Sequence, residues 1–150
     1  MPTRIYLDVC CMNRLFDNHS QERVRIESEA ISLILGRVQR TECEWITSET
    51  VDLEVDRTQD FERRTRLQLL TGPTQRKIIV SGTEEERALF LVGLGFDAYD
   101  ALHLACAESG GATVFLTTDH RLLRKAIRIA GQLQIRVVNP LVWVQETLGQ

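Results

Sequence analysis

The segment FDAYDALHLACAESGGATVFLTTDHRLL, residues 96–123, decides the fold of this chain. It predicts a helix, a break at two glycines, one short strand and a second helix. Asp97 and Asp100 stand at the start of the first helix, and residues three positions apart share a helical face. The apolar run 114–117 predicts the strand, and Asp119 follows its carboxyl end. Ligands of open parallel sheets bind at that edge, so these acids are candidates for a site.

Strands and helices alternate along the rest of the chain. Strands are expected at residues 4–8, 44–47, 77–80, 114–117 and 136–139, with a turn at 9–13. Helices are expected at 20–40, 48–54, 60–70, 88–94, 120–129 and 140–148, in addition to the helix that begins near Asp97. The alternation predicts one α/β domain over residues 1–150, with a mostly parallel sheet of four to five strands and helices on both faces.

Local signals define several helix ends. Ser48 is a good N-cap for the helix that runs through Glu54. Thr83 and Glu86 have the capping-box spacing, with Thr83 as the N-cap and Glu86 at the third helical position. The sequence Thr-Gly-Pro at 71–73 is expected to end the helix over 60–70.

The composition fits one compact domain. A chain of 150 residues with 43% hydrophobic content can form one core. No apolar run approaches the ~20 residues that span a bilayer, and the first residues carry no signal-peptide pattern, so a cytoplasmic location away from membranes is expected. The four cysteines lack a usual metal-binding spacing, and we expect reduced thiols. The net charge of −3 argues against a simple electrostatic nucleic-acid binder, although arginines at 63–66 and 121–128 could form a basic rim.

Four acids fall where the carboxyl ends of parallel strands would gather them. Asp8 ends the first strand, Glu54 lies about one helical turn beyond the second, Asp100 opens a helix and Asp119 follows the fourth strand. Each like-charge pair at ~4 Å costs roughly 1 kcal/mol in water. A hard cation with oxygen ligands removes that repulsion, so Mg²⁺ or Mn²⁺ is the expected occupant. The sequence therefore predicts a divalent-cation site suited to phosphoryl chemistry.

Several of these side chains also have a purely structural interpretation. Asp97 is expected to be an N-cap with Asp100 at the third helical position, and Asp119 could cap the helix that follows it. Glu49 is a reserve candidate for the site. His103 is expected to be a packed, hydrogen-bonded side chain rather than a zinc ligand, because the rest of a four-ligand set is missing.

The motifs together resemble the PIN domain, the fold of VapC-type toxin ribonucleases. The matching pieces are IYLD ending at Asp8, TSETVDLEV containing Glu54, DALHLACA starting at Asp100, and VFLTTD ending at Asp119. The resemblance implies a metal-dependent endoribonuclease whose products carry a 5′-phosphate and a 3′-hydroxyl. It further implies that these four acids form the metal site, that Thr117 supports it, that the chain forms a homodimer, and that a small antitoxin protein inhibits it.

One feature departs from the family pattern. The family usually carries Thr, Ser or Asn within two residues of the first Asp, whereas Val9, Cys10 and Cys11 follow Asp8 here. Asn13 is the candidate substitute for the missing side chain. The leading hypothesis is a ribonuclease that acts on RNA. The alternative is a catalytically weak or inactive PIN-like module that binds RNA or a protein partner.

Overall fold

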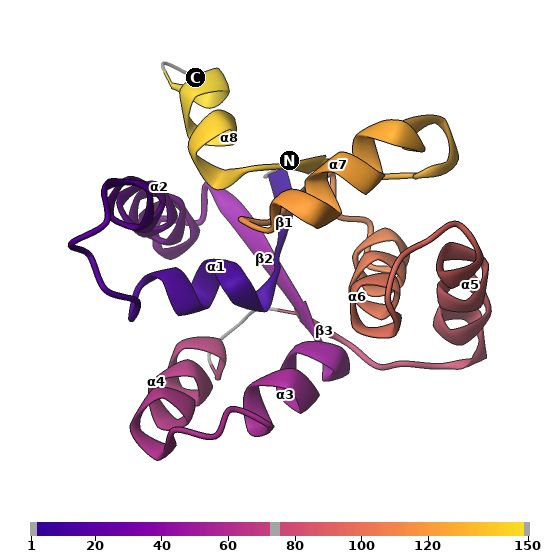
Figure 1. The fold of residues 1–150 in the computed structure, drawn as a ribbon, viewed down its shortest axis with the longest axis horizontal. Helices are drawn as coiled ribbons and strands as arrows, with labels where there is room; N and C mark the ends of the chain where they lie inside the picture. The colour runs from indigo at the N-terminus through magenta and orange to yellow at the C-terminus, as the bar shows by residue number, and fades with distance from the viewer. Residues whose placement is uncertain (1–2, 73–75, 149–150) are drawn as a thin grey trace.

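The computed structural model describes residues 3–72 and 76–148 and shows one five-stranded sheet (Figure 1). The strands are β1 Thr3–Leu7, β2 Cys43–Ser48, β3 Arg76–Ile78, β4 Val114–Leu116 and β5 Arg136–Val138. All four strand pairings are parallel, and the spatial order is β3-β2-β1-β4-β5. The predicted α/β class, the parallel sheet and the five strand positions are therefore confirmed.

Helices cover both faces of this sheet. They are α1 Val9–Arg14, α2 Glu22–Gln39, α3 Glu49–Asp56, α4 Phe61–Thr71, α5 Gly82–Gly93, α6 Ala98–Ser109, α7 His120–Arg128 and α8 Pro140–Thr147. In Figure 1, α1 and α2 lie on one side of β2, and α5 and α6 lie on the other. Among the described residues, no helix is both long and apolar enough to cross a bilayer.

The central strand β1 explains where a site can form. Its residues Ile5, Tyr6 and Leu7 are almost fully buried because helices cover both faces. Ile5 pairs with Trp45 of β2 on one side and with Val114 of β4 on the other. The chain proceeds outward from β1 in both directions, so β1 and β4 flank the point where the strand order reverses. The carboxyl ends of strands at such a point form a crevice that binds ligands.

The predicted turn at residues 9–13 is wrong, because these residues form helix α1. Valine and cysteine are only moderate helix formers, which is why the sequence alone favours a turn. The structure shows Val9, Cys11 and Met12 buried in the main core. Burial of one face of this short helix outweighs its weak local preference.

The predicted capping box of α5 is also wrong by two residues. The N-cap is Ser81 rather than Thr83, and the third helical position is Glu84 rather than Glu86. Both sequences have the required spacing, so local sequence cannot choose between them. Glu84 also accepts a hydrogen bond of 2.6 Å from Ser109 Oγ of α6, and this tertiary contact explains the choice.

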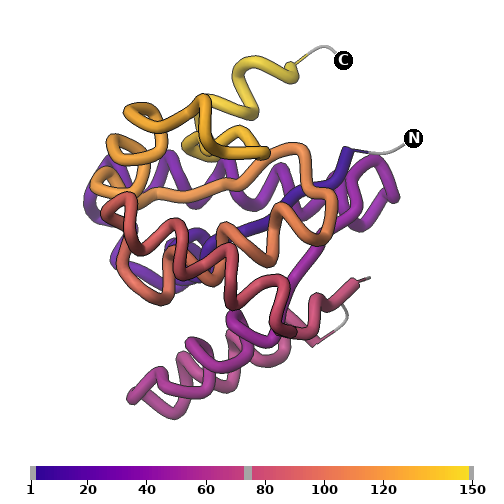
Figure 2. Tube along the Cα trace, turned by 90° about the vertical axis from the view of Figure 1, so that its right-hand side faces the viewer, coloured from indigo at the N-terminus to yellow at the C-terminus, as the bar shows by residue number. Residues whose placement is uncertain are grey.

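Helices α3 and α4 form a hairpin that projects from the body of the domain (Figure 2). Ser48 caps α3 as predicted, accepting a bond from Val51 N. Asp60 caps α4 in the same way through Arg63 N. The helix ends at Thr71, and Gly72 follows it, as the sequence predicts; Pro73, the third residue of that signal, lies outside the described residues.

Candidate metal and phosphate site

Asp8 lies at the centre of the candidate site. It follows β1 directly, is the N-cap residue of α1 and is only 6% exposed. Its backbone N–H donates to Leu116 O of β4, which fixes the end of β1 against the end of β4. Burial raises the pKa of Asp8, although the charge of His103 and the hydrogen bond from Thr117 act in the opposite direction. The carboxylate therefore sits in an environment that favours a nearby positive charge.

Two side chains donate hydrogen bonds to the Asp8 carboxylate. Thr117 Oγ1 donates to Asp8 Oδ2 over 2.8 Å, as expected for a hydroxyl that supports the site. Cys10 Sγ lies 3.4 Å from the same oxygen and 3.3 Å from Thr117 Oγ1. Cys10 thus occupies the place of the missing hydroxyl. The proposed substitution by Asn13 is wrong, because the Asn13 side chain accepts a bond from Arg63 instead.

Glu54 and His103 complete a compact group with Asp8. His103 Nε2 donates to Glu54 Oε1 over 2.8 Å. One ligand atom from each of Asp8, Glu54 and His103 lies within 4.8 Å of the others. Within residues 3–72 and 76–148 this is the one group of three or more such side chains at metal-binding spacing.

The preferred prediction, that His103 is packed and hydrogen-bonded, is confirmed, and the ring also faces the acids, which is the alternative that its position one turn after Asp100 leaves open. The ring is fully buried, and its Nδ1 lies 2.7 Å from Tyr6 Oη. Burial lowers the pKa of His103, but the bond to Glu54 and the charges of Asp8 and Asp100 outweigh that effect and raise it overall. The available signal was the position of His103 one helical turn after Asp100, on the same helical face.

Asp100 and Asp119 lie in the same electrostatic environment as this group. Burial and then the charges of Asp8, Asp97 and Asp119 raise the pKa of Asp100 to about 7. Asp119 caps α7, because its Oδ1 accepts bonds from Arg121 N at 2.9 Å and from the next residue. The charges of Asp8 and Asp119 thus act on Asp100, and Asp8 and Glu54 lie with His103 in one group of ligand atoms within 4.8 Å of one another.

The two other acids considered from sequence are structural. Asp97 caps α6 as predicted, since its Oδ1 accepts a 2.9 Å bond from Asp100 N. Glu49, the reserve candidate, turns away from the site. Its Oε1 accepts a 2.7 Å bond from Val80 N, which ties the start of α3 to the segment before α5.

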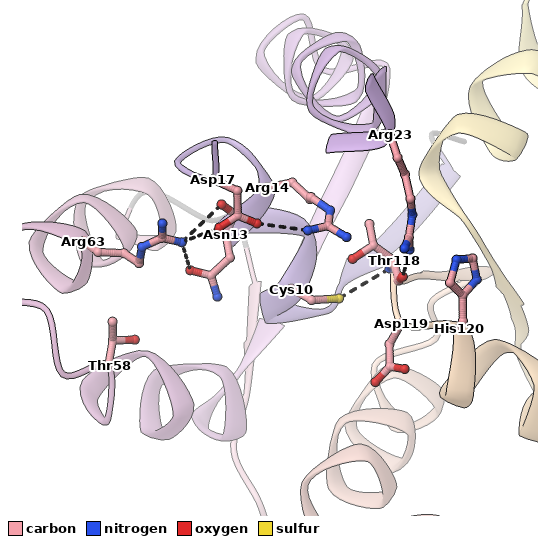
Figure 3. Close-up of a pocket in the computed structure, with 10 residues that line it drawn as sticks. All are labelled: Cys10, Asn13, Arg14, Asp17, Arg23, Thr58, Arg63, Thr118, Asp119 and His120. Carbon is pink, nitrogen blue, oxygen red and sulfur yellow. Dashed lines mark hydrogen bonds and ion pairs between the residues drawn. The ribbon is translucent and has the colours of Figure 1, made fainter. Parts of the chain in front are cut away.

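An open groove of about 640 Å³ lies beside Asp119 (Figure 3). Its lining residues are Cys10, Asn13, Arg14, Asp17, Arg23, Thr58, Arg63, Thr118, Asp119 and His120. Arg23 Nη2 donates to Thr118 O over 2.7 Å, and Arg63 Nη1 donates to Asp17 Oδ1 over 2.8 Å. The groove thus places Arg14, Arg23 and Arg63 near Asp119, each held by an ion pair with Asp17 or Glu27, and guanidinium groups of this kind can bind phosphate.

The donor set fits a divalent cation. The carboxylate oxygens of Asp8 and Glu54, which belong to the group within 4.8 Å, are the hard oxygen ligands that Mg²⁺ and Mn²⁺ prefer. His103 belongs to the same group, but its two ring nitrogens are hydrogen-bonded to Tyr6 and Glu54. Burial, and then the charges of neighbouring acids, raise the pKa of both Asp8 and Asp100. A bound cation would relieve both effects.

Comparison with known proteins agrees with the fold. The family model of the PIN domain matches residues 5–128, so the chain belongs to the PIN domain family, a family of nucleases. A comparison with curated proteins gave no match.

Two solved structures share this fold. VapBC-1 from nontypeable Haemophilus influenzae is 15% identical, with a TM-score of 0.57, and the match covers 92% of this chain and 98% of that one. VapBC2 from Rickettsia felis, whose structure was solved with a fragment of its promoter DNA, is 12% identical, with a TM-score of 0.54. The match covers 91% of this chain and 98% of that one.

Proposed function

We propose that this protein is a metal-dependent endoribonuclease that hydrolyses RNA phosphodiester bonds. The observation that carries the proposal is the close group of Asp8, Glu54 and His103, with the charges of Asp8 and Asp119 acting on Asp100 and a groove rich in arginine beside Asp119. Acids that repel one another in a folded protein are costly to keep. Cation binding gives a reason to retain them.

The roles of the residues follow from their positions. Asp8, Glu54, Asp100 and Asp119 would hold one or two Mg²⁺ or Mn²⁺ ions. A bound divalent ion supplies Lewis-acid stabilisation of charge on the scissile phosphate. Thr117 and Cys10 orient the Asp8 carboxylate through their hydrogen bonds.

The arginines of the groove would position the substrate backbone. Arg23 and Arg63 are held by bonds to Thr118 O and Asp17, so their guanidinium groups are already ordered before substrate binds. Contacts of this kind recognise phosphate and not base sequence. In the hydrolysis, water adds to phosphorus and the bond to the 3′ oxygen breaks, which leaves a 5′-phosphate and a 3′-hydroxyl.

We further propose that the enzyme is the toxin of a toxin–antitoxin pair, acts in the cytoplasm as a homodimer, and is inhibited by a small antitoxin protein. The support is membership of the PIN domain family and the similarity in fold to two proteins named VapBC. The groove beside Asp119 is open, so a protein segment could enter it as readily as RNA.

The test is cleavage of varied RNAs by purified protein with Mn²⁺ and then with EDTA. We expect Glu54→Gln and Asp119→Asn to keep the fold and lose cleavage. Asp52→Asn is the matched control, because Asp52 lies on the same helix as Glu54 but pairs with Lys77 outside the site. Full activity in both site variants, or turnover that EDTA leaves unchanged, would exclude the proposal.

The alternative function is a binding module with weak or no catalysis. The thiol of Cys10 favours it, because a thiol is a weak hydrogen-bond donor and holds Asp8 less firmly than a hydroxyl would. RNA binding without Mn²⁺-stimulated cleavage, in the wild type and over all substrates, would support this alternative.

A further inference from the structure

A line of polar side chains runs through the apolar core and ends at the candidate site. Ser48 Oγ lies 2.7 Å from Tyr6 Oη, which lies 2.7 Å from His103 Nδ1. The other ring nitrogen of His103 donates to Glu54 Oε1 over 2.8 Å. Ser48, Tyr6 and His103 are each 0% exposed. Burying three polar side chains together is unfavourable unless each is hydrogen-bonded, and here each of them is.

This line of hydrogen-bonded side chains begins at the N-cap residue of α3 and ends at a residue within α3. Ser48 is the N-cap of α3 and accepts a bond from Val51 N, whereas Glu54 lies in the last turns of α3. Between them the line passes through Tyr6 of β1 and His103 of α6. The side chains therefore tie α3 to the central strand and to the helix that carries Asp100. The relative positions of these three elements set the geometry of the acids.

The Glu54 side chain depends on its bond to His103, whereas Asp8 and Asp119 have other donors. Its side chain is 35% exposed, and its partner His103 is fully buried. Asp8 is fixed by Thr117, and Asp119 by the backbone of α7. Glu54 has a longer side chain with more rotamers, so without a partner it would turn toward solvent.

We infer that His103, supported by Tyr6, is the positioning residue that holds Glu54 beside Asp8 for cation binding. His103 is not itself the ligand, because both ring nitrogens are occupied by Tyr6 and Glu54. Side chains that orient a metal ligand in this way affect affinity strongly when removed. The inference deepens the proposed function and rests on it.

The ring contacts allow the Tyr6 hydroxyl to be removed while the packing of its ring is kept. Tyr6 stacks on Phe115 with ring centroids 5.3 Å apart, and it meets His103 edge-on at 5.8 Å. A Tyr6→Phe variant keeps both contacts and removes only the hydroxyl that links Ser48 to His103.

The experiment measures Mn²⁺ binding by calorimetry, without RNA, for four variants. We expect His103→Leu, which removes the donor, to weaken Mn²⁺ affinity about tenfold or more. His103→Gln keeps a side-chain N–H that can reach Glu54 and should recover most of that loss. Tyr6→Phe should weaken binding about threefold, because it loosens His103 without removing it.

Thr50→Val is the matched control. Thr50 Oγ1 lies 3.7 Å from Cys106 Sγ, so this variant also removes a buried hydroxyl between α3 and α6, but away from the acids. We expect it to change the melting temperature and leave Mn²⁺ affinity unchanged. The inference is overturned if His103→Leu binds Mn²⁺ as the wild type does, or if Thr50→Val weakens binding as much as His103→Leu.

Crystal structures of the wild type and His103→Leu separate this inference from the proposed function. If the wild type binds no Mn²⁺, the proposed metal site is excluded. The role of His103 is still tested by comparing the position of the Glu54 carboxylate in the two structures. Movement of the Glu54 carboxylate away from Asp8 in the variant supports positioning. An unmoved Glu54 contradicts it.

Discussion

Two acids near opposite ends of helix α6, the buried Glu84 of α5 and the partly exposed Asp100, lie in opposite environments. At the carboxyl end, Glu84 accepts hydrogen bonds from Ser109 Oγ and from both the hydroxyl and the N–H of Ser81. The hydrogen bonds from Ser109 and then Ser81 lower the pKa of Glu84 to about 2. At the amino end, burial and neighbouring acids raise the pKa of Asp100 to about 7.

This difference separates an acid that stabilises the fold from acids that form a candidate site. Hydrogen-bond donors directed at a carboxylate favour its charged form, whereas like charges and burial oppose it. Glu84 is fully satisfied by the protein and needs no ligand. Asp100 lacks such donors, and its carboxylate is repelled by neighbouring acids. A cation that removes this repulsion gains that free energy as part of its binding energy.

The largest effect should come from removing the charge of Asp8. We expect Asp8→Asn to reduce Mn²⁺-dependent RNA cleavage at least about a hundredfold, because the variant loses a ligand charge but keeps its shape. Its melting temperature should match or exceed that of the wild type, since burial already disfavours the charged form of Asp8. Cleavage assays and thermal unfolding of the same preparation check both expectations. A variant that cleaves normally would remove Asp8 from the site.

Glu84→Gln should show the reverse pattern, with lost stability and retained activity. We expect a loss of about 2 kcal/mol in the free energy of unfolding at pH 7, the scale of hydrogen bonds to a charged group. The pKa of Glu84 is lower in the folded protein than in the unfolded chain. Its contribution to the free energy of unfolding is therefore present above the unfolded pKa of ~4.3 and disappears as the pH falls toward 2. Urea unfolding across that range measures it.

Glu85→Gln is the control for the Glu84 experiment. Glu85 lies in the same first turn of α5 but is exposed. Its substitution should change stability by less than about 0.5 kcal/mol. Equal losses in the two variants would mean that the helix dipole, and not the bonds from Ser81 and Ser109, determines the contribution of Glu84.

Asp100→Asn should increase the stability of the metal-free protein above neutral pH. The pKa of Asp100 is higher in the folded protein than in the unfolded chain. Its contribution to the free energy of unfolding is therefore most favourable below the unfolded pKa and is lost as the pH rises through about 7. We expect a gain of about 1 kcal/mol at pH 8, the scale of one like-charge pair, and little change at pH 4. Unfolding with and without Mn²⁺ checks this, because the ion should stabilise the wild type more than the variant.

The difference in free energy of unfolding between Asp100→Asn and the wild type should change with pH. If it stays constant from pH 4 to 8, like-charge repulsion does not act at this end of α6. Asp52→Asn provides the comparison, since Asp52 lies outside the acid cluster and pairs with Lys77. Its effect on stability should not depend on Mn²⁺.

The smallest effect should come from Cys10. We expect Cys10→Ser to strengthen Mn²⁺ binding by less than about threefold, because a hydroxyl donates to Asp8 better than a thiol does. Cys10→Ala should weaken binding by a similar factor. Calorimetry measures both, with Cys43→Ala as a control at a buried cysteine of β2. Weaker binding by the serine variant than by the alanine variant would mean that the thiol does more than orient Asp8.

The order of the elements and the identity of the acids could be predicted from local patterns. Apolar runs that each end in a polar residue define the strands, and Asp97 and Ser48 mark helix starts through bonds to their own neighbours. The capping box of α5 could not be placed, because two boxes overlap in sequence and a contact with Ser109 selects one. Helix α1 could not be predicted, since its stability comes from burial of Val9, Cys11 and Met12.

The sequence by itself determined the α/β class and the parallel sheet, and it marked four candidate acids for the site, because periodicity and strand ends are local properties. Only the tertiary structure decided which side chains support those acids. Tyr6 and His103 are 97 positions apart, yet they form one hydrogen-bonded line to Glu54. Cys10 also contacts Thr117, which lies 107 positions along the chain and donates to the same Asp8 oxygen. Contacts between distant segments depend on packing in three dimensions, which no local pattern in the chain records.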